Sequence, residues 1–227
     1  MPTIVIPTAA GSGGNVARIN MGGENWAVII AGGGTFCAPF VSFIGIGITP
    51  HVVLGKWVMN GRCIFSIDTS VLGATATITS AILNLDGGGD GTDPPGILPT
   101  LNLYGATPAS ATPGDLVAAD YSQVGAIPLC NAPINFLDVH WHSTHNMVLN
   151  AAGIAAINKT GITAFSIRNT NYDVSGVDPI DHSGGADPGA SASFWLAGFT
   201  TLTITYTLPS PTPPNTKAAY PLSRRKL

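Results

Sequence analysis

The segment RCIFSID, residues 62–68, constrains the fold most strongly, because its apolar residues alternate with a period of two. In a β-strand, Cys63, Phe65 and Ile67 would point to one side, and the residues between them to the other side. Further short strands are predicted at residues 76–86, 100–107, 162–169 and 193–208, separated by turn-forming glycine, proline, asparagine and aspartate. The pattern predicts an all-β fold, an antiparallel jelly-roll-like β-sandwich with one short helix and extended termini.

Three regions follow from the pattern. Residues 1–25 are expected to form an N-terminal arm or first strand, 26–208 the β-sandwich domain, and 209–227 a proline-rich C-terminal tail. Within the sandwich, 26–60 should supply two or three strands, with a turn at Asn60-Gly61. The single helix is predicted in AAGIAAINKTG, residues 151–161, ending at Gly161.

The apolar stretch 26–50 is long enough to raise the question of a membrane span. Its five glycines and Pro39 favour buried strands with glycine turns, so we expect no membrane span. The first residues also lack the basic start and uninterrupted apolar run of a signal peptide.

Charged residues make up only 9% of the chain, against a usual quarter, and the net charge is −3. A surface with so little charge is poorly protected against self-association, which is typical of proteins in assemblies or outside cells. Nine lysines and arginines cannot form the basic stripe that phosphate neutralisation requires, so nucleic acid is not an expected partner.

Cys37, Cys63 and Cys130 are an odd number without metal-binding spacing. We interpret them as buried thiols made in a reducing cytoplasm, with a Cys37–Cys63 disulfide as the alternative. The composition therefore indicates an extracellular protein, whereas the N-terminus and the cysteines indicate a cytoplasmic one. A virion protein, made in the host cytoplasm and active outside it, reconciles the two.

Two clusters could hold a metal ion. Asp86, Asp90 and Asp93 lie in the glycine-rich segment DGGGDGTDPPG, where carboxylates and carbonyls together could bind calcium. The alternative is a solvated hairpin loop in which these residues satisfy turn geometry.

The second cluster is VHWHSTHN, residues 139–146. On a strand, His140 and His142 would share a face and could hold zinc or nickel, with Asp138 as a third ligand. The alternative is a polar patch around Trp141 that faces a neighbouring subunit or solvent.

Aromatic rings are the remaining candidate binding groups. Trp141 and Tyr172 have polar neighbours in the sequence, so they are the rings expected at the surface, in a ligand site or a subunit interface. Trp195 is expected to pack inside. The chain has no recognised catalytic motif, so we expect no enzyme activity.

The segments GRCIFSIDTSVLGATATITSAILNL and VLNAAGIAAINKTGITAFSIRNTNYD resemble those of DNRLRE-type domains. The resemblance covers about residues 57–207, and it departs from the family pattern at Ile67, where phenylalanine is usual. It implies a jelly-roll-like sandwich related to carbohydrate-binding modules, which occurs in secreted, cell-surface and phage structural proteins.

In such a sandwich the few charges would have structural roles. Asp68-Thr69-Ser70 at a strand end would hydrogen-bond the amides of the following turn. Arg62 and Arg168 would each bond loop carbonyls or a carboxylate such as Asp68 or Asp173. A ligand-binding role for these charges is the alternative.

The sequence thus favours a structural virion protein of a tailed phage, such as a capsid decoration, head-fibre, tail or baseplate component. Its partners would be other copies of itself, with which it would form a homo-oligomer. Neighbouring virion proteins and a host surface glycan would be further partners. The alternative is a carbohydrate-binding or adhesive module, extracellular or on a cell surface.

Overall fold

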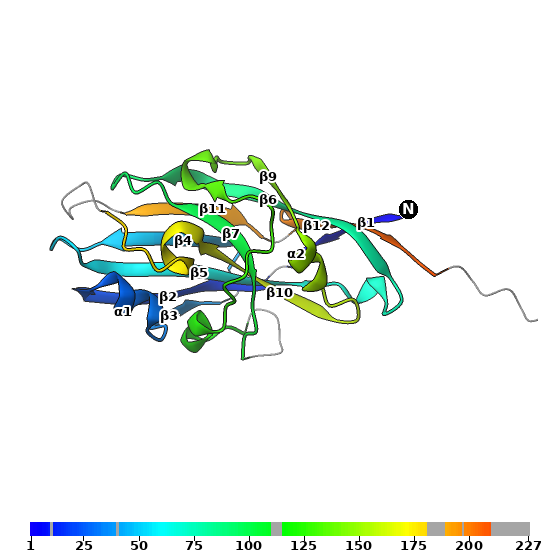
Figure 1. Cartoon of the computed structure of the whole chain (residues 1–227), viewed down its shortest axis with the longest axis horizontal. Helices are drawn as coiled ribbons and strands as arrows, with labels where there is room; N and C mark the ends of the chain where they lie inside the picture. Colours follow the sequence, from blue (N-terminus) through cyan, green and yellow to red (C-terminus); the bar gives the residue numbers. More distant parts are fainter. Residues whose placement is uncertain (10, 40, 110–114, 181–188, 197, 210–227) are drawn as a thin grey trace, which may run out of the picture.

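The computed structural model describes residues 1–9, 11–39, 41–109, 115–180, 189–196 and 198–209. These residues form a 12-stranded antiparallel sheet, which confirms the predicted all-β fold (Figure 1). The strands are β1 (Thr3–Pro7), β2 (Gly13–Glu24), β3 (Phe36–Ala38), β4 (Phe43–Pro50), β5 (Trp57–Asp68), β6 (Thr77–Thr92), β7 (Thr100–Gly105), β8 (Ile134–Asn135), β9 (Thr144–Val148), β10 (Ile162–Asn169), β11 (Ala190–Trp195) and β12 (Thr201–Thr207).

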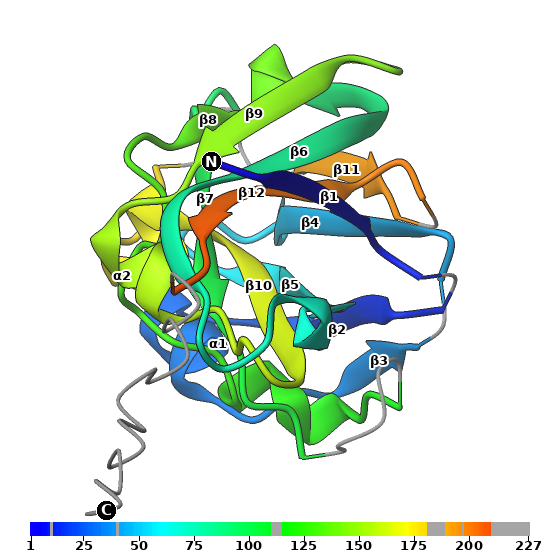
Figure 2. The same ribbon diagram turned by 90° about the vertical axis from the view of Figure 1, so that its right-hand side faces the viewer.

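The hydrogen-bonded order is β1-β12-β6-β11-β4-β5-β10-β7-β8, with β2 bonded to β5 and β3, and β9 bonded to β6. The long strand β5 changes partner along one edge, from β4 at residues 57–60 to β10 at residues 63–68. This change lets the sheet curl, and Figure 2 shows its two halves facing each other across the core. The arrangement agrees with the predicted sandwich or jelly-roll-like fold.

The predicted alternation of RCIFSID is confirmed. Cys63, Phe65 and Ile67 lie in the main core between the two halves of the sheet. Ile64, on the opposite side of β5, is buried in a smaller cluster with Val16, Leu116 and Tyr121. The strand is therefore covered on both faces, because the segment around the short 3-10 helix η2 (Ala118–Ser122) packs over its outer side.

The prediction of strands alone over residues 26–60 is wrong at its start, where helix α1 (Trp26–Ala31) forms. Trp26 and Ile29 are spaced three apart and are both buried, which is helical and not strand spacing. The predicted helix, α2 (Ala151–Ala155), is therefore the second one. Its N-cap is Asn150, whose side chain accepts the Gly153 amide at 2.9 Å, and it ends at Ala155 and not at the predicted Gly161.

The predicted turn at Asn60-Gly61 is also wrong, because β5 continues through both residues. Asn60 donates a hydrogen bond to the Tyr121 hydroxyl at 2.8 Å instead of forming a turn. The turn between β4 and β5 lies earlier and contains Gly55, whose φ of 72° is the left-handed conformation that glycine favours.

The glycine-rich segment after Asp86 was expected to be a loop, but β6 runs on to Thr92. The chain from Phe136 to Ser143 lies directly against it. A Cβ on Gly87 would be 2.0 Å from the His140 carbonyl oxygen, and one on Gly91 would be 1.7 Å from that of Phe136. These glycines therefore allow a close approach of two chain segments.

Residues 1–25 supply β1 and β2, which belong to the same sheet as the rest of the domain. Most of the predicted C-terminal tail, residues 210–227, lies outside the described residues. In the part of the chain that is described, no helix has the length and apolar character needed to cross a membrane.

Candidate functional site

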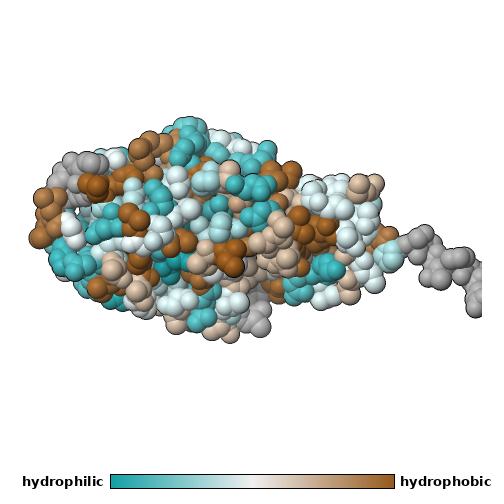
Figure 3. All heavy atoms as spheres, in the orientation of Figure 1, coloured by the Kyte–Doolittle hydropathy of each residue, from teal (hydrophilic) through white to brown (hydrophobic). Residues whose placement is uncertain are grey.

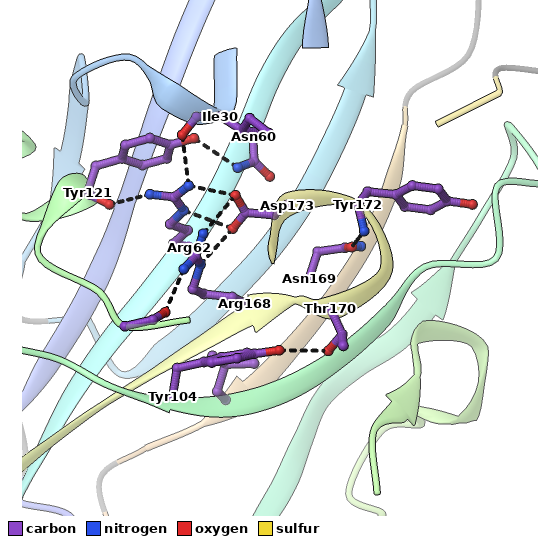
Figure 4. Close-up of polar contacts among 12 residues, drawn as sticks. Ile30, Asn60, Arg62, Tyr104, Tyr121, Arg168, Asn169, Thr170, Tyr172 and Asp173 are labelled. Carbon is purple, nitrogen blue, oxygen red and sulfur yellow. Dashed lines mark hydrogen bonds and ion pairs between the residues drawn. The ribbon is translucent and has the colours of Figure 1, made fainter. Parts of the chain in front are cut away.

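The most densely bonded polar cluster is buried and joins Arg62, Arg168 and Asp173 (Figure 4). The two arginines lie on the neighbouring strands β5 and β10, and Asp173 lies in the π-helical turn η4 (Thr170–Val174). Arg62 donates to the two carboxylate oxygens at 2.8 and 2.5 Å, and Arg168 donates to them at 2.9 and 3.1 Å. Asp173 is thus held by two guanidinium groups.

The remaining N–H groups of the arginines bond loop carbonyls, as the sequence predicts. Arg62 donates to the carbonyls of Tyr121 and Ile30, and Arg168 donates to that of Gly125 at 2.6 Å. The guanidinium carbon of Arg62 also lies 3.7 Å from the centre of the Tyr121 ring, a cation–π distance.

Burial by itself would raise the pKa of Asp173, but the charges and hydrogen bonds of Arg62 and Arg168 outweigh it and lower that pKa. The two arginines and Asp173 are at most 7% exposed. Because its members are buried and bonded to one another, the cluster fixes loops to the sheet and offers no surface for a substrate.

Asp68 confirms the other structural prediction for a charged residue. Its carboxylate accepts the Ser70 amide at 3.0 Å at the end of β5, and this bond and the Ser70 side chain lower the pKa of Asp68. The buried Thr69 hydroxyl bonds the carbonyls of Asn158 and Gly161 at 2.6 and 2.9 Å.

The structure brings the two predicted metal clusters together, because two aspartates of the first cluster each lie next to a histidine of the second. Asp86 Oδ1 lies 3.4 Å from His142 Nδ1, and Asp90 Oδ1 lies 3.7 Å from His140 Nδ1. Asp93 lies apart from these pairs and accepts the amides of residues 97 and 98 at 3.0 and 2.7 Å.

His140 and His142 lie in a turn before β9 and not on a strand, and His142 has a positive φ of 54°. Asp138 accepts a hydrogen bond from Asn135 at 3.0 Å, so it is engaged within its own turn. Among the described residues, no group of three or more histidine, cysteine, aspartate or glutamate side chains has a metal-binding arrangement.

The two pairs border an aromatic cluster, which we call the aromatic corner: Phe43, Trp141, Trp195 and Phe199. The Trp195 ring lies at the centre, with ring centroids 5.8 Å from Phe43, 5.9 Å from Trp141 and 6.1 Å from Phe199. Phe43, Trp141 and Phe199 are 50%, 56% and 53% exposed. Large rings are enriched at recognition surfaces, which makes this exposed cluster a candidate binding site.

Polar atoms without partners lie beside these rings. Trp195 and Asp86 are cross-strand partners on β11 and β6. Among the described residues, the Trp195 indole N–H and Asp86 Oδ1 have no hydrogen-bond partner, although His142 lies at ion-pair distance from that oxygen. Both atoms are buried, so they are unsatisfied polar groups next to the rings and not contact points on the surface.

The other aromatic predictions have mixed outcomes. Tyr172 is half-buried against the core and its hydroxyl donates to the Ile97 carbonyl, so it is not the exposed ring that its polar neighbours suggest. Trp195 is also only partly buried, because its ring forms the centre of the aromatic corner. Phe43 and Phe199 were not predicted as site residues.

All three cysteines are free thiols, so the alternative of a Cys37–Cys63 disulfide is wrong. Cys63 and Cys130 are buried, and burial raises the pKa of each thiol to about 12, which makes them inert. Cys37 is partly exposed, against the expectation of burial.

No protein-family model matches the chain, and no curated protein matches it significantly. The resemblance to DNRLRE-type domains thus stays a prediction.

Proposed function

We propose that this protein is a structural component of a tailed-phage virion that works by subunit assembly and surface binding, and not by catalysis. The observation that carries the proposal is an exposed apolar surface at the end of the molecule that contains the β4–β5 hairpin. Figure 1 places this hairpin at the left end and the N-terminus at the right, and Figure 3 shows hydrophobic residues at the left end, next to hydrophilic ones.

This surface, the apolar end, consists of Met21, Val52, Val53, Leu54, Val177 and Ile180, which are 77%, 72%, 54%, 67%, 56% and 70% exposed. The segments that carry these residues contact one another. A Cβ on Gly23 would be 2.7 Å from the His51 ring, and Trp57, just after the hairpin, donates to Asp178 at 2.9 Å. Contiguous exposed apolar residues mark interaction sites in soluble proteins.

Asp178 lies within the apolar end and accepts the Trp57 hydrogen bond, and the nearest other charges also have hydrogen-bond partners within the molecule. Glu24 accepts two hydrogen bonds from Arg18, at 2.6 and 2.5 Å, and Lys56 donates to Asn25 at 2.7 Å. A mainly apolar surface with few charges, of both signs, can pack against its own copy with little like-charge repulsion, and homo-oligomer interfaces are the most apolar class. Assembly with other copies of the chain is therefore the simplest use of this surface.

Light scattering on a size-exclusion column, over a range of concentrations, tests the proposal. We expect the wild-type protein to form a defined oligomer and Val53→Asp to shift it to the monomer. Because Val53 is exposed, stability should change by less than about 0.5 kcal/mol. Val71→Asp is the matched control, since Val71 is 61% exposed and follows β5 at its other end.

A wild-type protein that stays monomeric at high concentration would contradict assembly, as would equal effects of the two substitutions. Deleting residues 1–25 is a poor test, because it removes two strands of the sheet. The virion role is tested separately by mass spectrometry of purified phage particles from cells that carry the gene, which should contain the protein. Adjacent portal, capsid or tail genes would agree with that role.

A carbohydrate-binding or adhesive surface module is a second candidate function, and the exposed rings of the aromatic corner favour it. Such a module would remain monomeric in solution and would bind immobilised glycans. The oligomeric state found in the same column experiment separates the two functions.

A further inference from the structure

The outer face of β4 and β11 continues from the aromatic corner as a shallow groove. Residues two apart on a strand share a face, and the core residues Ile44, Ile46 and Phe194 occupy the inner face of these two strands. The outer face carries Phe43, Gly45 and Gly47 on β4, and Ser191, Ser193 and Trp195 on β11. Small residues thus form a floor that begins at the rings of Phe43 and Trp195.

A pocket of about 260 Å³ lies over this floor. Gly45, Gly47, Ser191 and Ser193 line it, with Phe36 and Met59 among the larger side chains. A Cβ on Gly45 would come no closer than 3.8 Å to its neighbours, so glycine there leaves open space that another residue could fill. From Phe43 to Gly47 the floor is roughly 13 Å long, at the rise of a β-strand.

Asp90 connects the pocket with the aromatic corner. It is one of the pocket residues, and its carboxylate accepts the Trp141 amide at 3.0 Å. Its side chain is 73% exposed and is the only charged one among the described residues that line the pocket. The groove therefore offers hydroxyl groups, one carboxylate and, at one end, exposed ring faces.

We propose that this groove, from Phe36 to the aromatic corner, binds a neutral oligosaccharide. A sugar ring has an apolar C–H face that packs on Trp141 or Phe43, and its hydroxyls both donate and accept hydrogen bonds. Ser191, Ser193 and Asp90 supply matching polar groups along the floor. The inference rests on the surface-binding part of the proposed function and names the class of ligand.

An extended peptide fits the groove less well. Over the floor, β4 is bonded on one edge to β11, and its pairing with β5 begins only at Ile48. On the β5 side the Gly45 amide already donates to the Asn15 side chain at 2.8 Å, and a peptide lying on the face of the floor would not reach the main-chain groups at the strand edges that give strand addition its affinity. A nucleic acid is disfavoured by the carboxylate and by the absence of a basic residue among the described residues of the pocket.

The test is a glycan array of neutral oligosaccharides, followed by titration of the best soluble ligand with tryptophan fluorescence as the readout. We expect saturable binding that weakens at least tenfold in Gly45→Val, which fills the floor, and in Trp141→Ala, which removes a ring. Gly105→Val is the matched control, because Gly105 is also a strand glycine, has no atom within 4 Å of its Cβ position and lies outside the groove.

No binding to any array member, or equal binding by wild type and Gly45→Val, would overturn the proposal. Binding of an extended peptide that Gly45→Val abolishes would overturn the ligand class. The oligomeric state of each variant is measured in parallel. A wild-type oligomer that binds no sugar refutes this inference alone, whereas a sugar-binding monomer refutes the assembly proposal alone.

Discussion

The buried arginine–aspartate cluster and the aromatic corner use their side chains in opposite ways. Arg62, Arg168 and Asp173 are charged and buried, and each makes several hydrogen bonds within the protein. Trp141, Phe43 and Phe199 are apolar and exposed, and two buried polar atoms without partners among the described residues lie beside them. In most proteins charges lie outside and large apolar rings inside, so both regions depart from the ordinary distribution.

The difference separates residues that hold the fold from residues available for binding. A buried charge is tolerable only when it is paired, so the cluster depends on all three of its members. An exposed ring adds little to stability but provides contact area to a partner. Substitutions in the buried cluster should therefore mainly lower the free energy of unfolding. Substitutions in the aromatic corner should mainly weaken binding.

The largest expected effect is that of Asp173→Asn. This change leaves two buried guanidinium groups facing each other without a counter-charge, and we expect a loss of about 3–5 kcal/mol in the free energy of unfolding. Denaturant titration measures it. Asp90→Asn, at an exposed carboxylate, is the control and should change stability by less than about 0.5 kcal/mol. Similar losses in the free energy of unfolding in the two variants would contradict the view that the buried cluster holds the fold and the exposed region does not.

Acid should act on the same cluster. The pKa of Asp173 is lower in the folded protein than its ordinary value of about 3.9, because of the two arginines. Its contribution to stability is thus fully present above the ordinary pKa and is lost as the pH falls through the folded pKa. Denaturant titrations from pH 6 down to about pH 2 should show this loss in the wild type and a smaller one in Asp173→Asn. If the free energy of unfolding fell equally with pH in the wild type and in Asp173→Asn, the acid sensitivity would not come from Asp173.

The smallest expected effect on stability is that of Trp141→Ala. The ring is 56% exposed and lies on a turn, so its removal should change the free energy of unfolding by no more than about 0.5 kcal/mol. A melting curve that matches the wild type would sharpen the contrast with Asp173→Asn. A loss as large as that of a core aromatic would mean that the corner is part of the scaffold.

Local patterns were sufficient to predict the all-β fold, the core face of β5 and the structural charges, but not all strand boundaries. The period-two alternation of RCIFSID fixes which face of β5 enters the core, and Asp173 follows Arg168 by only five residues. Helix α1 was missed because an apolar run of six residues fits a strand or a helix equally well.

The aromatic corner could not be predicted in full, because it depends on contacts between distant segments. Trp141 meets Trp195 only because the turn before β9 crosses the glycines of β6. One signal was present in the sequence, in the shared alternation of Phe43-Gly45-Gly47 and Ser191-Ser193-Trp195. Aromatic and small residues at every second position indicate a flat outer face that ends in a ring.

Strand β4 has a further consequence, since its two ends belong to different surfaces. Phe43 lies in the aromatic corner and Pro50 leads into the hairpin of the apolar end, roughly 23 Å away along the strand. Copies joined at their apolar ends would leave the aromatic-corner end of each groove away from the interface, and would present several such corners at a fixed spacing. Weak contacts made by each groove would then add up to tight attachment through avidity, without any change in a single site.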